Sequence, residues 1–170
     1  ITFAVGANPA RVRWAIEKAR SSRRAAGLDP DALGFGAYVN VAPHPNIAIA
    51  RELVRGGVGT MAHFSGMRGS SVEGVASEDR AVFSGIHQRY EREQHTLGRA
   101  RHAAALDAAF LDRFAVVGPT RDCVARLREL VDAEPELFAD ATPDVFAELN
   151  CAFMSPVVIR VPAGKVIADP

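Results

Sequence analysis

The chain has 170 residues, of which 48% are apolar and 24% charged, and its 20 basic and 20 acidic side chains give a formal net charge of zero. This composition excludes a disordered chain, and the balanced charge argues against a long basic surface for nucleic acid or an anionic membrane. No apolar run approaches the ~18 residues of a membrane span and no charged-then-apolar leader is present. Two cysteines, Cys123 and Cys151, fit a reducing compartment, so we expect a cytoplasmic protein without a membrane partner.

The first 26 residues carry a strand pattern followed by a helix pattern. A short apolar run at 3–5 ends at Gly6, and Asn8 followed by Pro9 predicts the start of a helix. An asparagine side chain accepts orphan backbone N–H groups, and proline at the first helical position loses no bond that the helix needs. Gly27 is expected to end this helix, because glycine adopts the left-handed conformation at no steric cost.

A second strand and a second helix follow. The nearly continuous apolar run at 35–41 is typical of a strand covered on both faces, as in a parallel sheet. Prolines at 43 and 45 stop it, and an amphipathic helix begins near Ile47. The alternation of strands and helices predicts an α/β fold.

The pattern loosens beyond residue 60. Residues 65–77 are rich in glycine and serine and predict a loop, after which Ser77 is expected to cap a helix. The remaining expected elements are a short helix at 106–112, a strand at 114–118, a helix capped by Thr120 with Val124, Leu127 and Val131 on one side, and a last strand at 157–161.

Few residues suggest chemistry by their spacing. The five histidines are scattered, no Cys-x-x-Cys or His-x-x-x-His pair occurs, and no metal site is expected. No phosphate-binding or dinucleotide-binding glycine motif follows a predicted strand, and no nucleophile elbow is present. Cys123 follows a helix start, which lowers a thiol pKa, but a buried structural cysteine is the stronger interpretation.

Two turns that join a strand to a helix are candidate anion sites. Residues 6–9 and 118–120 each place a glycine and a capping residue at a helix N-terminus, where free N–H groups favour a phosphate. Ordinary helix capping is the stronger interpretation of either turn taken alone. Asp122 competes with an anion at the second turn, so the first turn is the better candidate.

Three sequence blocks together resemble the luciferase-like family of flavin- or deazaflavin-dependent oxidoreductases. They are 3–16, which begins Phe-Ala-Val-Gly-Ala-Asn-Pro; 36–65, which includes Val-Asn-Val-Ala-Pro-His-Pro; and 113–124, which includes Val-Val-Gly-Pro-Thr. Their order and spacing agree from residue 1 to about 132. The resemblance implies a TIM-type (β/α)8 barrel, of which these blocks would form the C-terminal half.

The resemblance also implies a cofactor, either FMN or the deazaflavin coenzyme F-420, that carries a hydride to or from a small organic substrate while the protein positions it. We expect Gly6, Ala7, Asn8 and Asn40 to contact the cofactor. His44 and Phe64 are expected to line the substrate pocket. In a barrel, ligands gather where strands end and helices begin, so Gly6, Ala7, Asn40 and His44 would face one common mouth. No residue qualifies as a catalytic acid or base.

The final part of the chain departs from the resemblance. Where the family has a glycine, an apolar residue and an aspartate before its last strand, residues 132–136 contain Pro135, which would disrupt a central strand. We therefore expect a domain at 1–132 and a divergent segment at 133–170. Because the chain starts inside an apolar strand and a complete barrel needs about 250 residues, we expect a piece of a longer protein.

Half a barrel leaves strand edges unpaired and part of its core exposed. We therefore expect a homo-oligomer or association with the missing half of the barrel. The leading functional hypothesis is a flavin- or deazaflavin-dependent oxidoreductase or monooxygenase, with this chain alone inactive. The alternative is a non-catalytic truncated barrel that binds flavin or a partner protein. A nucleic-acid partner is not expected, because the arginines of the first helix form an ordinary solvated face.

Overall fold

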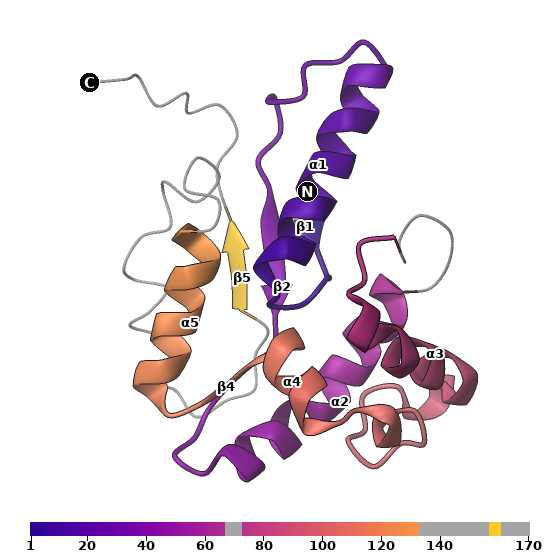
Figure 1. Ribbon diagram of the computed structural model, residues 1–170, viewed down its shortest axis with the longest axis vertical. Coiled ribbons are helices and arrows are strands. Elements are labelled where there is room, and N and C mark those ends of the chain that lie inside the picture. Colours follow the sequence, from indigo (N-terminus) through magenta and orange to yellow (C-terminus); the bar gives the residue numbers. More distant parts are fainter. Residues whose placement is uncertain (67–72, 133–156, 161–170) are drawn as a thin grey trace.

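The computed structural model describes residues 1–66, 73–132 and 157–160 (Figure 1). Its helices are α1 (Pro9–Ala25), α2 (Ile47–Ser65), α3 (Arg80–Arg89), α4 (Ala108–Phe114) and α5 (Thr120–Asp132). Its strands are β1 (Thr2–Phe3), β2 (Gly36–Val39), β3 (Val41–Pro43), β4 (Val116–Gly118) and β5 (Val157–Arg160). Three short 3-10 turns complete the described elements: η2 (Ser77–Asp79), η3 (Arg92–Gln94) and η4 (Ala103–Ala105).

The strands form two small sheets. In the first, the order is β1-β2-β5, with β1 parallel and β5 antiparallel to β2, and in the second β3 and β4 are parallel. The expected strand at 35–41 is thus divided at Asn40, whose carbonyl oxygen accepts a hydrogen bond from the Val116 N–H at 2.9 Å. The fold is α/β as predicted, but the described strands do not confirm half of a parallel barrel, because β5 runs antiparallel.

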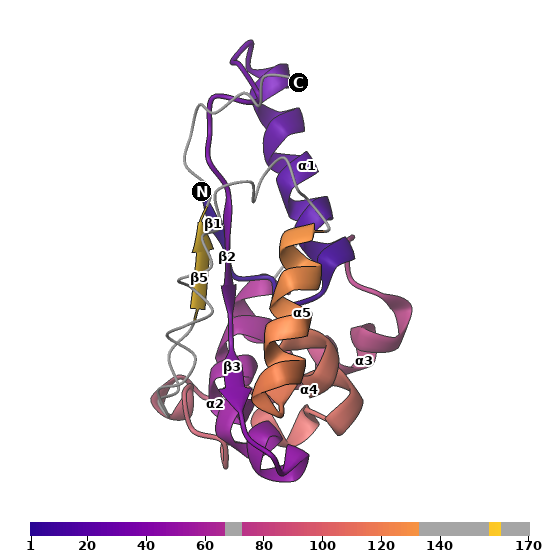
Figure 2. The same cartoon turned by 90° about the vertical axis from the view of Figure 1, so that its left-hand side faces the viewer.

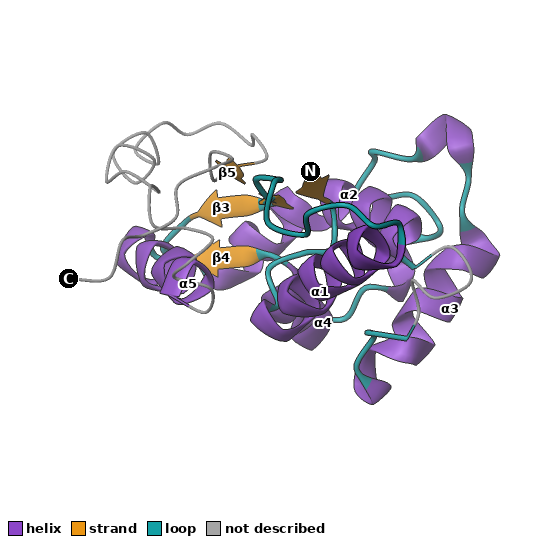
Figure 3. Cartoon of the chain, turned by 90° about the horizontal axis from the view of Figure 1, so that it is seen from above, coloured by secondary structure: helices purple, strands orange, loops and turns teal. Residues whose placement is uncertain are grey.

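The β3 strand lies between two layers of helices. Val41 belongs to a core cluster that includes α1 and α5, whereas Ala42 belongs to a cluster that includes α2, α3 and α4. Successive strand residues point to opposite faces, so this alternation shows that both faces of the strand are covered. Figure 2 shows α1 and α5 on the same side of β2 and β5, and Figure 3 shows β3 and β4 between α5 and α2. Only Val41 of the predicted run at 35–41 lies in β3, and Phe35, Ala37 and Val39 are buried in the cluster of α1 and α5.

Polar caps fix where three helices begin. Asn8 Oδ1 accepts hydrogen bonds from the N–H groups of Ala10 and Arg11 at 3.0 and 3.4 Å, so Asn8 caps α1 as the sequence predicts. Asn46 does the same for α2, and Asp107 Oδ1 accepts the Phe110 N–H at 2.7 Å for α4. Each cap satisfies donors that have no partner within the helix.

Three expected helix positions are corrected. Ser77 does not cap a helix, because its hydroxyl donates to Glu78 and α3 begins only at Arg80 after the η2 turn. The helix expected at 106–112 begins at Ala108 instead, since Asp107 is its cap. Thr120 is the first residue of α5 and not its cap. The predicted apolar side of α5 is confirmed at Leu127, which is buried with Cys123 and Leu130, and Val131 packs against the same cluster. Much of the loop at 65–77 and most of 133–170 lie outside the described residues.

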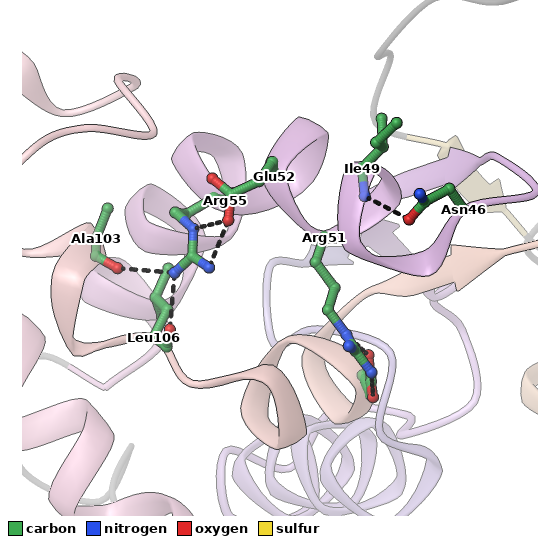
Figure 4. Close-up of polar contacts among 8 residues, drawn as sticks. Asn46, Ile49, Arg51, Glu52, Arg55, Ala103 and Leu106 are labelled. Carbon is green, nitrogen blue, oxygen red and sulfur yellow. Dashed lines mark hydrogen bonds and ion pairs between the residues drawn. The ribbon is translucent and has the colours of Figure 1, made fainter.

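Two arginines of α2 attach this helix to the elements that follow it (Figure 4). Arg51 binds Asp112 of α4 through two parallel hydrogen bonds of 2.8 and 2.6 Å. Arg55 donates to the carbonyl oxygens of Ala103 and Leu106 at 3.2 and 2.7 Å, and its other nitrogens bind Glu52. The η4 turn and α4 are therefore held on α2 by bidentate and charge-assisted hydrogen bonds, the stronger kind of hydrogen bond.

Gly6 occupies a position where any side chain would be strained. Its φ is +84°, and a Cβ added there would lie 2.7 Å from the Phe114 ring. We predict that Gly6→Ala lowers the free energy of unfolding by about 2–4 kcal/mol, from backbone strain and overpacking together.

The matched control is Gly27→Ala, where φ is +68° but nothing lies within 4 Å of the added Cβ. Only the backbone cost of about 1–2 kcal/mol applies there. Urea unfolding followed by circular dichroism measures both variants. Equal decreases in the unfolding free energy of Gly6→Ala and Gly27→Ala would show that the Phe114 ring does not restrict the turn at Gly6.

Candidate functional site

A cavity of about 290 Å³ lies at the N-terminus of α1. The residues that line it come from the β1–α1 turn, α1, the segment before α3, α3 itself and the end of α4. They are Val5, Asn8, Ala10, Arg11, Trp14, Glu73, Gly74, Val75, Ala76, Asp79, Phe83, Arg113 and Phe114. Below it is called the α1 cavity. Apolar rings form much of its wall, and its polar side chains are Asn8, Arg11, Arg113, Glu73 and Asp79.

The turn that leads into α1 is anchored from two directions. The Ala7 N–H donates to the Phe114 carbonyl oxygen at 2.8 Å, and Arg126 of α5 donates to the Ala7 carbonyl oxygen at 3.3 Å. Gly6 and Ala7 are both buried. These two residues therefore place Asn8 and the first turn of α1 at the cavity, but neither of them lines it.

Arg11 brings a buried positive charge to the cavity. Only 6% of the residue is exposed, and its Nη2 donates to the Ser65 carbonyl oxygen at 2.9 Å. Its guanidinium carbon lies 4.3 Å from the centroid of the Trp14 ring, a cation–π geometry. Burial lowers the pKa of Arg11 from its usual value, and the group stays charged because arginine starts so far above neutrality.

Arg113 and Asp79 form an ion pair in the opposite wall. Both Nε and Nη2 of Arg113 donate to Asp79 Oδ1, the first at 3.1 Å. Asp79 is 8% exposed, and the hydrogen bond to it raises the pKa of Arg113. The lining thus contains two cations, Arg11 and Arg113, and two carboxylates, Asp79 and Glu73, and Asp79 pairs with Arg113.

Three sequence-predicted site residues lie away from the α1 cavity. The His44 N–H donates to the Gly118 carbonyl oxygen at 2.7 Å, so His44 lies beyond the end of β4, whereas Ala7 contacts Phe114 ahead of its start. Asn40 packs against α2, where its Oδ1 would lie 2.4 Å from a Cβ on Gly57. Phe64, near the end of α2, is 54% exposed. Of the predicted site residues, Asn8 lines the α1 cavity and Gly6 and Ala7 form the turn before it. Asn40, His44 and Phe64 do not line the cavity.

A stack of aromatic and imidazole rings lies between α2 and α3, which the sequence did not predict. His63 stacks on Tyr90 with centroids 3.5 Å apart and lies 5.4 Å from His87, and Tyr90 lies 4.9 Å from His102. His102 is fully buried, with Nε2 3.3 Å from the His95 carbonyl oxygen. These rings come from positions 63 to 102 with no periodic spacing, so only the tertiary fold brings them together.

Neither a metal site nor a reactive cysteine is found in the part of the chain that the structure describes. No group of three or more histidine, cysteine, aspartate or glutamate side chains there could hold a metal ion. Cys123 is buried and donates to the Gly118 carbonyl oxygen at 3.4 Å, and burial raises the pKa of its thiol to about 11. Its role is in packing, as the sequence indicated. No helix among the described residues is long and apolar enough to span a membrane.

Comparison with known proteins identifies the family. The model of the luciferase-like monooxygenase family matches residues 1–136, so the chain belongs to that family. Family membership implies flavin-dependent oxidoreductase activity in general terms, and such enzymes use reduced flavin or a deazaflavin. The match ends close to residue 132, where the sequence resemblance also ends. Searches of curated proteins and of solved structures found no match.

The ring stack makes the stability of the fold sensitive to acid. Burial, and then the charges of His87 and His102, lower the pKa of His63. The folded state therefore binds fewer protons than the unfolded state, so His63 supports folding fully above its ordinary pKa of about 6.5 and loses this contribution as the pH falls below it. We predict that the free energy of unfolding in urea decreases from pH 7.5 to pH 5.

The variant His63→Phe keeps a ring on Tyr90 but cannot titrate. Its unfolding free energy is expected to fall less than that of the parent chain over the same pH range. His44→Gln serves as the control and is expected to follow the parent. An identical decrease in His63→Phe and in the parent chain would contradict this account.

Proposed function

We propose that the chain takes part in hydride transfer between a flavin or deazaflavin cofactor and a small organic substrate, and that the α1 cavity receives part of the cofactor. The observation that carries the proposal is the cavity itself, which combines Asn8, Arg11 and Arg113 with an apolar wall in a chain of the luciferase-like family. The cofactor ring would supply the hydride chemistry, and the protein would bind and orient it.

The lining of the α1 cavity suits such a molecule. Trp14, Phe83 and Phe114 offer flat apolar surfaces of the kind that a planar ring system contacts. Arg11 and the positive end of the α1 dipole favour an anionic group such as a phosphate. At about 290 Å³ the cavity is at the lower limit of small-molecule sites, which measure about 300–1,000 Å³, so it fits a part of such a cofactor.

The residues around the α1 cavity would have separate tasks. The Gly6–Ala7 turn holds the helix N-terminus in place through Phe114 and Arg126. Asp79 orients Arg113, whose guanidinium is thereby kept at the wall. The rings of Trp14 and Phe83 exclude water from one side of the cavity. Within the described chain none of these tasks requires a protein acid or base, in keeping with a reaction in which the cofactor carries the hydride.

The fluorescence of Trp14 provides a direct test. It is the single tryptophan of the chain and it lines the α1 cavity, so a flavin bound there quenches its emission. We predict saturable, micromolar quenching by either FMN or coenzyme F-420, and the one that binds more tightly is the cofactor.

Two matched variants show whether the α1 cavity is the binding site. Ala10→Phe adds a ring at the cavity from an exposed position and is expected to weaken binding at least tenfold, about 1.4 kcal/mol. Ala25→Phe makes the same change at the other end of α1, roughly 22 Å away along the helix, and is expected to bind as the parent does. Unchanged binding by Ala10→Phe, or no quenching in a chain that circular dichroism shows to be folded, contradicts the proposal.

A further inference from the structure

A second cavity, of about 560 Å³, lies along α3. It is called the α3 groove below. One side is a face of α3, and the other side includes Gly66 at the end of α2 and Val75. Glu73, Val75 and Phe83 line both this groove and the α1 cavity, so the two cavities share a wall.

The α3 side of the groove is a polar helix face. This face consists of Arg80, Ser84, His87 and Gln88. Ser84 and Gln88 lie four and eight residues after Arg80, and His87 lies three after Ser84, so all four share one face of the helix. All four are exposed, whereas Val82 and Ile86 on other faces are buried in the core. The groove is thus lined by hydrogen-bonding groups that the packing of α3 does not use, apart from a bond from Gln88 to Ser84 at 3.2 Å.

The groove contains a cation, Arg80, that no carboxylate of the described residues pairs. Arg80 makes no ion pair with any residue in the described ranges, and its neighbour Asp79 is paired with Arg113. The acidic residue of the groove, Glu73, is neutralised by Lys18 at 2.7 Å. A cation that has no carboxylate partner in the described part of the chain therefore faces a cavity that also offers hydroxyl, amide and imidazole groups.

Phe83 supplies a rigid apolar surface in the same groove. Its ring packs edge to face against Phe110 and Phe114, with centroids 5.5 and 6.2 Å away. Gly66 lies so close that a Cβ there would be 2.2 Å from the ring, which leaves the ring no freedom to move towards α2. A flat apolar group that enters the groove meets a fixed aromatic face.

We propose that the α3 groove binds a small organic anion, with its carboxylate or phosphate monoester group held by Arg80 and hydrogen-bonded by Ser84 and Gln88. The apolar part of the ligand rests on Phe83. Because the groove shares a wall with the α1 cavity, the bound anion is the substrate that lies beside the cofactor. This last step alone rests on the proposed function, whereas anion binding does not.

The test is a titration of the isotope-labelled chain, followed by amide chemical shifts, with sodium benzoate, phenyl phosphate and neutral benzyl alcohol. At least one of the two anions is expected to shift residues 80–88 saturably and to bind at least tenfold more tightly than benzyl alcohol. Arg80→Gln is expected to weaken that binding at least tenfold. Arg89→Gln makes the same charge change on the same helix, about 180° around from Arg80, and is expected to have no effect.

The proposal is overturned if Arg80→Gln binds the anion as tightly as the parent chain, or if Arg89→Gln weakens anion binding as much as Arg80→Gln does. It is also overturned if benzyl alcohol binds as tightly as the anions. So does the absence of shifts for both anions. Both positions are exposed, so the variants are expected to keep the circular dichroism of the parent chain. Amide shifts on α3 without quenching of Trp14 by FMN or F-420 would support the anion site and contradict the proposed cofactor site. Quenching of Trp14 without amide shifts on α3 would support the cofactor site and contradict the anion site.

Discussion

The rest of the structure depends on the close contact between Gly6 and Phe114. A glycine at φ +84° lets the turn between β1 and α1 rest directly on the aromatic ring, and the Ala7 N–H then reaches the Phe114 carbonyl oxygen. This one contact joins the first helix to the junction of α4 and β4, and Arg126 adds α5 to it. The position of Asn8, and with it the first turn of α1, follows from that contact.

Two layers of helices around the strands explain why the cavities lie where they do. Phe83 and Phe114 belong to or pack against the cluster of α2, α3 and α4, while Trp14 packs against the cluster of α1 and α5. The α1 cavity is lined by residues of both clusters, and its cations are Arg11 on one side and Arg113 on the other. A ligand there would contact both layers at once, which makes this junction the natural place for a site.

Local signals in the sequence predicted much of the fold. The Asn8–Pro9 start of α1, the glycine after its end and the strand pattern before residue 41 were recognisable because capping and alternation are short-range properties. The site was predicted only in part. Asn8 lies at the α1 cavity, but His44 lies beyond the far end of β4, and the described strands do not confirm the expected barrel. Arg11, Asp79, Arg113 and the ring stack join residues from distant positions, and no periodicity in the sequence reports such contacts.

The central claim is that the cofactor binds at the α1 cavity. Hydrogen–deuterium exchange with and without cofactor tests it most directly, because protection is measured separately for peptides near the start of β4 and for peptides near its end. The account predicts that FMN or F-420 slows exchange in peptides covering the start of α1 and the segment before α3, residues 5–14 and 73–83. It predicts no change at 41–50, where His44 and the start of α2 lie. Slower exchange at 41–50 and 116–122 with none at 5–14 would contradict the account and move the cofactor to the carboxyl ends of β3 and β4.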